Sequence, residues 1–378
     1  MRDQRLTKLA EILLDHSVKI QPHETLMIDV YGDGSELAKE LVKEAYKRDA
    51  FPFVNLIDEE LQRLLIEGSS EEREALKQKL DLATIHEMKA SIRIYGSRND
   101  LELSKIDPQK RLLNQKARKP YMDHLINNVK WSLLNYPNAK MAQKAGMSLE
   151  EFEDMFFKVC TLDYSKMDRA MDNLKELLDK TDHVHIKGPG TDLEFSIKGQ
   201  GSIKCAGEVN IPDGEIYTAP VRESVNGTIS FNTSSTYQGT SFSNIVFEFK
   251  NGKIIEARSN DEKKLKEILD TDEGARFIGE FAIGVNPYIL NPINDTLFDE
   301  KIAGSFHFTP GQAYKDESYN GNDSKIHWDI VNIQRPEYGG GEIWFDGVLI
   351  RKDGLFVIDS LLPLNPEHLV DEKDTVTV

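Results

Sequence analysis

The chain has 378 residues, with 47 Lys or Arg and 64 Asp or Glu, so its formal net charge is −17. The acidic surplus argues against nucleic acid or an anionic membrane as a partner, because both bind clustered Lys and Arg. Two distant cysteines, Cys160 and Cys205, exclude a disulfide framework and a thiolate zinc site. This cysteine usage is typical of a reducing, cytoplasmic setting. The length of the chain predicts two domains.

The first half of the chain alternates segments typical of strands with segments typical of helices. Its opening residues predict an amphipathic helix with Leu6, Leu9, Ile12 and Leu13 on one face, and they lack the apolar core of a signal peptide. No apolar run reaches the roughly 18–20 residues that would span a bilayer. Strands are predicted at 25–31, 51–57, 90–95 and 130–134, and helices at 35–48, 59–87, 108–129 and 148–180. This order predicts βαβ units in an α/β domain over residues 1–181, with a mostly parallel sheet.

The sequence pattern changes near Asp182, where short runs of alternating apolar and polar residues, separated by turn residues, begin. Asn251-Gly252 is a hairpin signal, and Asp346-Gly347 and Asp353-Gly354 separate three predicted strands near the end of the chain. One helix is predicted over 261–269 and a shorter one from Asp272. Residues 182–378 therefore predict an α+β catalytic domain rich in antiparallel sheet.

Several kinds of active site are disfavoured by missing motifs. The glycine-containing turns match neither a P-loop nor a G-x-G-x-x-G dinucleotide fingerprint. No G-x-S-x-G elbow is present, so a serine hydrolase has no support.

Histidines and carboxylates within apolar strand patterns are better candidates for active-site residues. His327 and Asp329 alternate around Trp328, so a strand would project both side chains to one face, where they could hold a cation or form a buried hydrogen-bonded pair. His183 and His185 have the same spacing but no evident third ligand. His307 lies in a second aromatic strand pattern.

Isolated glutamates complete the candidate set. Glu280 lies in an apolar run, where a charge is costly unless it is paired or bound to a metal, and Glu215 follows a Pro-Asp-Gly turn. Either could instead face solvent, and Glu300 could belong to a solvated turn. Together these residues form a carboxylate-rich, histidine-containing set without cysteine, which is what dinuclear hydrolases use to generate a metal-bound hydroxide.

Four blocks of the sequence carry a resemblance to a known family. They are NIPDGEIYTAPVRESVNG (210–227), EGARFIGEFAIG (273–284), NDTLFDEKIAGSFHFTPGQAY (294–314) and SKIHWDIV (324–331). In this order they resemble the M29 family of metalloaminopeptidases. The resemblance implies an enzyme that removes N-terminal residues from peptides with a free N-terminus, using two divalent cations (Zn²⁺, Co²⁺ or Mn²⁺), and that forms a homodimer.

The resemblance also implies roles for individual residues. The implied metal ligands are Glu215, Glu280, Glu300, His307, His327 and Asp329. Tyr314 corresponds to the family's catalytic tyrosine, and Glu280 could also relay a proton. The chain departs from the family pattern in a longer Glu300-to-His307 spacing and in the residues after His307, Phe308-Thr309-Pro310. Two alternatives stay open, a non-catalytic metal-stabilised ligand-binding protein and another dinuclear hydrolase.

Overall fold

The computed structural model describes residues 3–370. Its contacts divide the chain into two compact units: unit 1 is residues 1–161 with 207–212, and unit 2 is residues 162–206 with 213–378. The domain boundary predicted between residues 181 and 182 stays a prediction, because contacts within a folded chain do not say which segment folds on its own. None of the helices in the described part of the chain has the length and apolar character needed to cross a membrane.

Unit 1 is built on a five-stranded parallel sheet. Across the sheet its strands are β2 (Phe51–Ile57), β1 (Thr25–Gly32), β3 (Ala90–Gly96), β4 (Lys130–Asn135) and β8 (Asn210–Ile211). The central strands β1 and β3 are buried along most of their length, as expected for parallel strands with helices on both faces.

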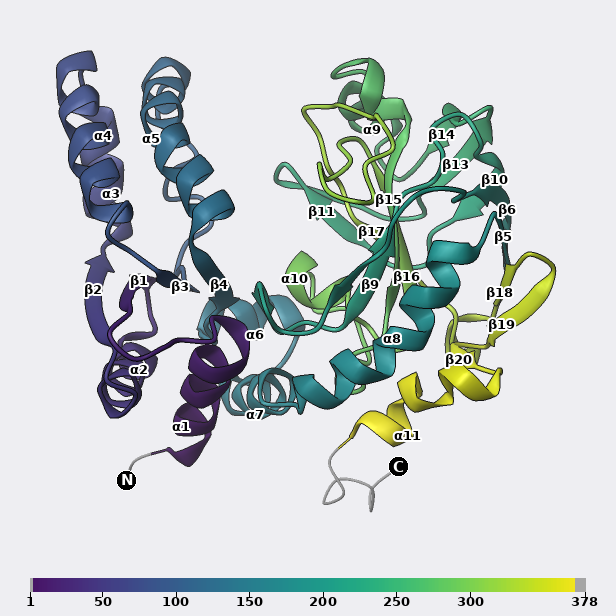
Figure 1. Ribbon diagram of the computed structural model, residues 1–378. Helices are drawn as coiled ribbons and strands as arrows, with labels where there is room; N and C mark the ends of the chain where they lie inside the picture. The colour runs from purple at the N-terminus through teal and green to yellow at the C-terminus, as the bar shows by residue number, and fades with distance from the viewer. Residues whose placement is uncertain (1–2, 371–378) are drawn as a thin grey trace. The chain divides into compact units, whose positions relative to one another are not determined.

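The helices of unit 1 form two packed groups, which Figure 1 shows on opposite faces of the sheet. One group contains α1 (Gln4–Glu11), α2 (Ser35–Lys47) and α7 (Leu149–Cys160), and the other contains α3 (Glu59–Glu67), α4 (Glu71–Ile85) and α5 (Pro108–Asn128). A short helix, α6 (Ala139–Ala145), packs on α7. This layered arrangement confirms the predicted α/β class.

Two of the predicted helices are each divided in the structure. The helix predicted over 59–87 is interrupted after α3 by Gly68, and Ser70 caps the start of α4 by accepting a hydrogen bond from the Arg73 N–H. The region predicted over 148–180 is likewise two helices, α7 and α8 (Tyr164–Lys180), and Asp163 caps the second. In both cases a capping side chain satisfies N–H groups that a continuous helix would have bonded internally.

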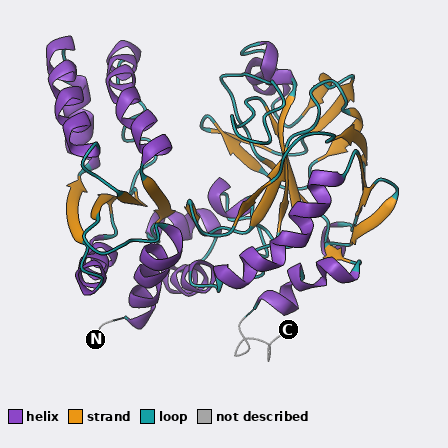
Figure 2. Ribbon diagram, in the orientation of Figure 1, coloured by secondary structure: helices purple, strands orange, loops and turns teal. Residues whose placement is uncertain are grey.

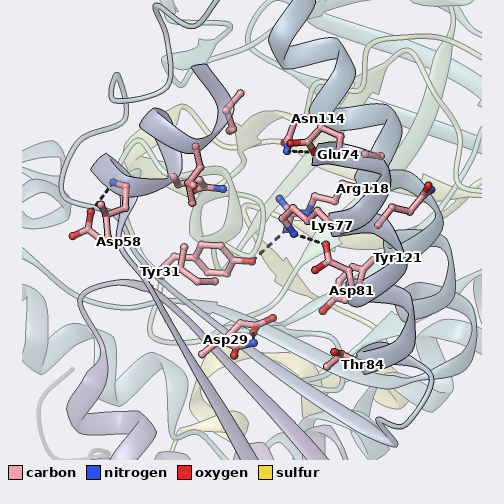
Figure 3. Close-up of a pocket in the computed structure, with 18 of the residues that line it drawn as sticks. Asp29, Tyr31, Asp58, Glu74, Lys77, Asp81, Thr84, Asn114, Arg118 and Tyr121 are labelled. Carbon is pink, nitrogen blue, oxygen red and sulfur yellow. Dashed lines mark hydrogen bonds and ion pairs between the residues drawn. The ribbon is translucent and has the colours of Figure 1, made fainter. Parts of the chain in front are cut away.

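A cavity of about 510 Å³ lies in unit 1 beside the sheet and helices α3, α4 and α5. Figure 3 shows Asp29 and Tyr31 on the sheet side and Arg118 on the helix side, with the Arg118 guanidinium donating to the Tyr31 hydroxyl at 3.3 Å. None of the metal ligands implied by the sequence lines this cavity.

Unit 2 is dominated by strands, as Figure 2 shows by colour, and these strands pair in antiparallel fashion. Its larger sheet has the order β14 (Lys253–Arg258), β13 (Val246–Lys250), β10 (Asn226–Ser230), β6 (Thr191–Ser196), β5 (His183–Gly188), β18 (Glu342–Phe345), β19 (Val348–Lys352) and β20 (Leu355–Phe356). Its smaller sheet, here called the site sheet, has the order β17 (Ile330–Ile333), β16 (Ser305–Pro310), β15 (Ile278–Gly284), β9 (Glu215–Thr218) and β7 (Ile203–Cys205). The predicted antiparallel α+β class of the second half is confirmed.

The remaining elements of unit 2 are short, apart from α8. They are the hairpin β11 (Ser235–Tyr237) and β12 (Thr240–Phe242), the helices α9 (Glu262–Leu269), α10 (Thr296–Asp299) and α11 (Pro366–Leu369), and 3₁₀ turns that include η2 (Glu273–Arg276). The shorter helix predicted from Asp272 is this single 3₁₀ turn.

An aromatic core joins the two sheets of unit 2. Phe195 on β6 contacts Phe281 on β15 and Phe308 on β16, with ring centroids 5.2 and 5.3 Å apart. Each fully buried Phe side chain stabilises the fold by about 1.5–3 kcal/mol. Because side chains alternate along a strand, residues next to these phenylalanines point to the other face of the site sheet. That other face carries the polar residues described below.

Candidate metal centre

The candidate site lies on the polar face of the site sheet. β9 begins at Glu215, β15 carries Glu280 and β16 carries His307. In the antiparallel register Ala282 lies opposite His307, and Gly284 lies opposite Glu215. These small residues leave space between strands for the larger polar side chains.

Five side chains at this face converge within ion-pair distance. The His307 Nε2 atom lies 3.1 Å from Glu280 Oε1 and 3.6 Å from Glu215 Oε2. The His327 Nε2 atom lies 3.4 Å from Glu280 Oε2 and 3.2 Å from Asp329 Oδ1. The two imidazoles thus share Glu280 between them.

Glu300 joins the cluster from outside the sheet. It caps the short helix α10, and its carboxylate lies close to the Glu215 carboxylate and the His307 imidazole in a group that could hold an ion. The backbone after Glu300 runs against Gly284, where a Cβ atom would come within 2.6 Å of the Ile302 carbonyl oxygen. A glycine on β15 therefore permits this close approach. All six residues that the sequence implied as ligands come together.

The cluster contains buried oxygens with no hydrogen bond from any described residue. Glu215 and Glu280 are only 5% and 3% exposed, and each has one such oxygen atom, Oε2. Buried polar atoms are normally satisfied, so each of these oxygens needs a partner. Two overlapping groups in the cluster have the spacing of metal ligands: Glu215, Glu300 and His307, and Glu280, His307 and Asp329.

The surplus of carboxylates perturbs the ionisation of the cluster. Burial disfavours a charged His307, but Glu280, Glu215 and Asp329 outweigh burial and raise its pKa to about 10. Burial likewise opposes a charged His327, yet Asp329 and Glu280 raise its pKa to about 10. Burial, opposed in part by Lys301, raises the pKa of Glu300 to about 8. The cluster therefore attracts positive charge, and a divalent cation at an imidazole would displace its proton.

Residues around the cluster orient its ligands. The His327 Nδ1–H donates to the Gln312 carbonyl oxygen at 2.7 Å, which directs Nε2 toward Glu280 and Asp329. The Thr309 hydroxyl donates to Asp329 Oδ1 at 2.7 Å. Such outer partners fix the tautomer of a metal-binding imidazole and the rotamer of a metal-binding carboxylate.

Tyr314 lies at the open side of the cluster. Its ring centroid is 4.9 Å from that of His327, and the side chain is 49% exposed. Partial burial, together with the charges of Glu280 and Asp329, raises the pKa of the Tyr314 phenol. The hydroxyl therefore stays protonated and able to donate a hydrogen bond.

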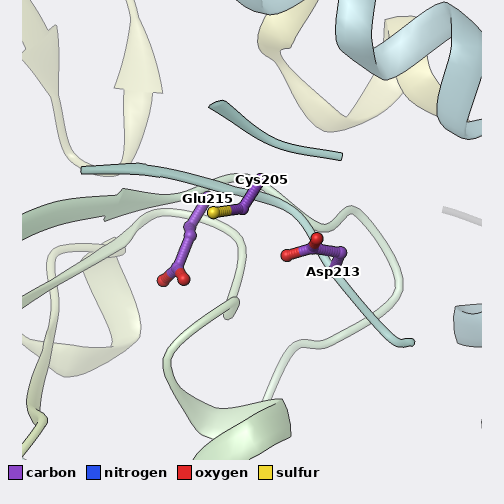
Figure 4. A group of neighbouring side chains, drawn as sticks. All are labelled: Cys205, Asp213 and Glu215. Atoms are coloured by element: carbon purple, nitrogen blue, oxygen red, sulfur yellow. The ribbon is translucent and has the colours of Figure 1, made fainter. Parts of the chain in front are cut away.

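Three residues at the cluster were not predicted from the sequence. Lys301 is fully buried and bonds to Glu215 and Glu300. Asp213 and Cys205 form a group with Glu215, which Figure 4 shows. In the sequence Asp213 is simply part of the Pro-Asp-Gly turn before Glu215, and nothing around Lys301 indicates that its side chain is buried. Burial raises the pKa of the Cys205 thiol, which favours its neutral form.

The alternative histidine pair lies elsewhere in unit 2. His185 Nε2 is 2.6 Å from Asp192 Oδ1, and His183 Nε2 is 3.5 Å from Glu194 Oε2. Both contacts are to exposed carboxylates on the neighbouring strand β6.

Buried carboxylates and imidazoles with unsatisfied oxygens, gathered on one face of a sheet, make up the donor set of a metal-dependent hydrolase. Residues 2–342 match the family model described as thermophilic metalloprotease (M29), so the chain belongs to this family. Membership confirms the resemblance read from the four sequence blocks. It also confirms the predicted class of enzyme, a hydrolase of peptide bonds.

Individual relatives agree with this assignment. Aminopeptidase AmpS of Bacillus subtilis is 27% identical over 350 residues, covering 82% of this chain and 85% of the relative. Aminopeptidase T of Thermus thermophilus is 26% identical over 382 residues, covering 86% of this chain and 91% of the relative. The solved structure of wild-type AmpT from Thermus thermophilus has a TM-score of 0.78 at 24% identity, covering 94% of this chain and 99% of that one. This likeness shows a common fold.

Proposed function

We propose that this protein is a metal-dependent aminopeptidase that hydrolyses the N-terminal peptide bond of peptides through a water molecule activated by two divalent cations. The observation that carries the proposal is the buried cluster of Glu215, Glu280, Glu300, His307, His327 and Asp329 in a chain of a metalloprotease family. The relatives named above are aminopeptidases, which supports action at the N-terminus of a peptide.

The donor atoms fit divalent cations that accept both nitrogen and oxygen. Glu215, Glu300 and His307 would hold one cation, and Glu280, His327 and Asp329 would hold the other, with His307 or Glu280 near both. The donors suit Zn²⁺, Co²⁺ or Mn²⁺. Once bound, such cations lower the pKa of a shared water and polarise the carbonyl group of the substrate.

The protein's own groups would position the substrate and move protons. Glu280 lies between the two imidazoles of the cluster, where its carboxylate would accept a proton from the attacking water and pass it to the leaving amine. The Tyr314 hydroxyl would donate a hydrogen bond to the oxyanion of the tetrahedral intermediate. The free α-amino group of the substrate needs a carboxylate partner, which the acidic cluster supplies.

The partners, the oligomeric state and the location of the enzyme are proposed from its charge, its family resemblance and its cysteines. The net charge of −17 supports a protein that binds neither nucleic acid nor an anionic membrane. The family resemblance supports a homodimer, and the two scattered cysteines support a cytoplasmic location.

The proposal is tested by assaying release of the N-terminal residue from aminoacyl anilides and short peptides. Purified protein is stripped with a chelator and then supplied with Co²⁺, Zn²⁺ or Mn²⁺. Release is expected only with metal and only from substrates with a free amine, and N-acetylated versions of the same substrates serve as controls. Metal binding without release from any unblocked substrate would contradict the proposal and favour a non-catalytic protein, whereas release from blocked amides would indicate another amide hydrolase.

A further inference from the structure

Lys301 introduces a positive charge into the ligand cluster from the protein itself. Its side chain is fully buried, and the Nζ atom lies 2.8 Å from Glu215 Oε1. Nζ also donates a hydrogen bond to Glu300 Oε1 and lies 3.9 Å from Asp213 Oδ1. A buried ammonium is costly unless several acceptors surround it, and here three carboxylates do so.

The two ligand groups of the cluster therefore differ in kind. On one side, Glu215 and Glu300 already share a lysine ammonium. On the other side, Glu280 and Asp329 lie beside the imidazoles of His307 and His327, which are themselves implied metal ligands. A cation that binds at the histidine side therefore meets side chains that can coordinate it, whereas a cation that binds at the lysine side must displace the Lys301 ammonium.

We propose that the Lys301 ammonium is an internal cation that competes with divalent metal for Glu215 and Glu300, so that the two metal positions fill in a fixed order with unequal affinity. The position at Glu280, His327 and Asp329 fills first, and the position at Glu215 and Glu300 fills second and more weakly. This inference rests on the proposed function for the presence of two metal positions.

The structure also offers the displaced ammonium a second partner. Asp213 is 1% exposed, and its Oδ1 atom is the next carboxylate oxygen after those of Glu215 and Glu300. Figure 4 shows the Asp213 carboxylate beside Glu215 and Cys205. A short movement of Lys301 toward Asp213 would free Glu215 and Glu300 for a metal while keeping the ammonium paired. Moving the ammonium away from Glu215 and Glu300 costs free energy. This cost weakens metal binding at the second position without abolishing it.

This order is tested by titrating metal-stripped full-length protein with Co²⁺. Calorimetry and the visible absorption of bound Co²⁺ measure the binding. The wild-type chain should bind one equivalent tightly and a second at least tenfold more weakly. Lys301→Met removes the competing charge at similar length, so its second equivalent should bind at least tenfold more tightly than in the wild type. Lys301→Arg keeps the charge and should keep the second position weak. Lys198→Met, at an exposed lysine paired with Asp182, is the matched control and should leave both affinities unchanged.

Two equivalents binding to the wild-type chain with equal affinity would overturn the inference, whether or not Lys301→Met folds. A weak second position that Lys301→Met leaves unchanged would overturn it as well. Peptide hydrolysis measured on the same samples separates this inference from the proposed function. Unequal binding without hydrolysis contradicts the function alone, and hydrolysis with two equal positions contradicts the inference alone.

Discussion

At the scale of single residues, the balance of charge decides what the cluster can hold. Glu215, Glu280, Glu300 and Asp329 are gathered with few positive partners, and burial prevents water from screening them. The imidazoles respond with raised pKa values, and Asp329 responds with a lowered pKa because His327 and His307 outweigh the effect of its burial. Such mutual shifts are typical of sites that bind cations or transfer protons.

Tyr314 provides a prediction at this scale. If its hydroxyl stabilises the oxyanion, Tyr314→Phe should lower kcat about 10²–10³-fold, which is the usual effect of losing one such donor. Metal content should stay as in the wild type, because this role places the phenol on the oxyanion and leaves the carboxylate and imidazole ligands unchanged. Steady-state kinetics alongside elemental analysis of the purified variant checks both expectations. Loss of metal from the variant would instead make Tyr314 structural.

At the scale of secondary-structure elements, the loops that enter and leave the site sheet hold the ligands in position. Asp272 precedes η2 and accepts hydrogen bonds from the Ala275 N–H at 3.0 Å, the Ser324 hydroxyl at 2.7 Å and the Lys325 N–H at 2.7 Å. It thereby ties the start of β15 to the segment that leads to His327. One side chain thus couples two ligand-bearing parts of the chain.

Asp272→Asn should lower stability in a pH-dependent way. Burial opposes the charge of Asp272, but its three hydrogen bonds outweigh burial and lower the pKa below the usual 3.8. The folded state thus favours the carboxylate, so its contribution is complete above the unfolded pKa and is lost as pH falls through the lower folded value. Asn keeps one oxygen acceptor but presents an amide nitrogen where the other carboxylate oxygen was, so the variant should be about 0.5–1.5 kcal/mol less stable than the wild type near pH 7, with the difference shrinking in acid.

Urea unfolding at pH 7 and near pH 3 measures this difference. Glu256→Gln, at an exposed carboxylate of β14 with no such bonds, is the control and should show little change at either pH. A loss of stability in Asp272→Asn that is the same at both pH values would show that the carboxylate charge is unimportant.

Gly284 tests the close approach between β15 and the segment that carries Glu300. A Cβ atom at this position would lie 2.6 Å from the Ile302 carbonyl oxygen and 3.0 Å from that of Glu300. Gly284→Ala should therefore displace this segment, destabilise the fold by about 1–3 kcal/mol and weaken metal binding. Gly68→Ala, at a helix end where the nearest atom would be 3.4 Å away, is the control. Unchanged metal affinity in Gly284→Ala would show that Glu300 is not needed as a ligand.

The strands of the first half and the six clustered residues could be predicted from the sequence. The break within one helix and the burial of Lys301 could not. β2 has the predicted bounds, because hydrophobic patterning marks strands directly. The break between α3 and α4 depends on the capping of Ser70, which competes locally with helix continuation. The burial of Lys301 could not be predicted, because only the folded arrangement surrounds it with carboxylates from distant segments.

At the scale of the whole molecule, metal binding should be coupled to folding. The ligands come from segments as far apart in sequence as Glu215 and Asp329, so an unfolded chain would hold a cation only weakly. Metal at about 100 times its dissociation constant should then stabilise the protein by roughly 2.7 kcal/mol. Thermal unfolding over a series of Co²⁺ concentrations should show a rising Tm that a chelator reverses. A Tm that does not depend on metal would contradict this coupling.

If the cluster on the site sheet is the metal centre of this enzyme, cations should bind there before they bind elsewhere. Anomalous diffraction from crystals of the full-length protein grown with Co²⁺, collected on both sides of the cobalt absorption edge, locates the bound ions. We expect a dispersive peak bounded by Glu280, His327 and Asp329, with a second peak near Glu215 and Glu300 at higher Co²⁺. Peaks confined to other positions, such as His183 and His185, with none at the cluster, would contradict this expectation.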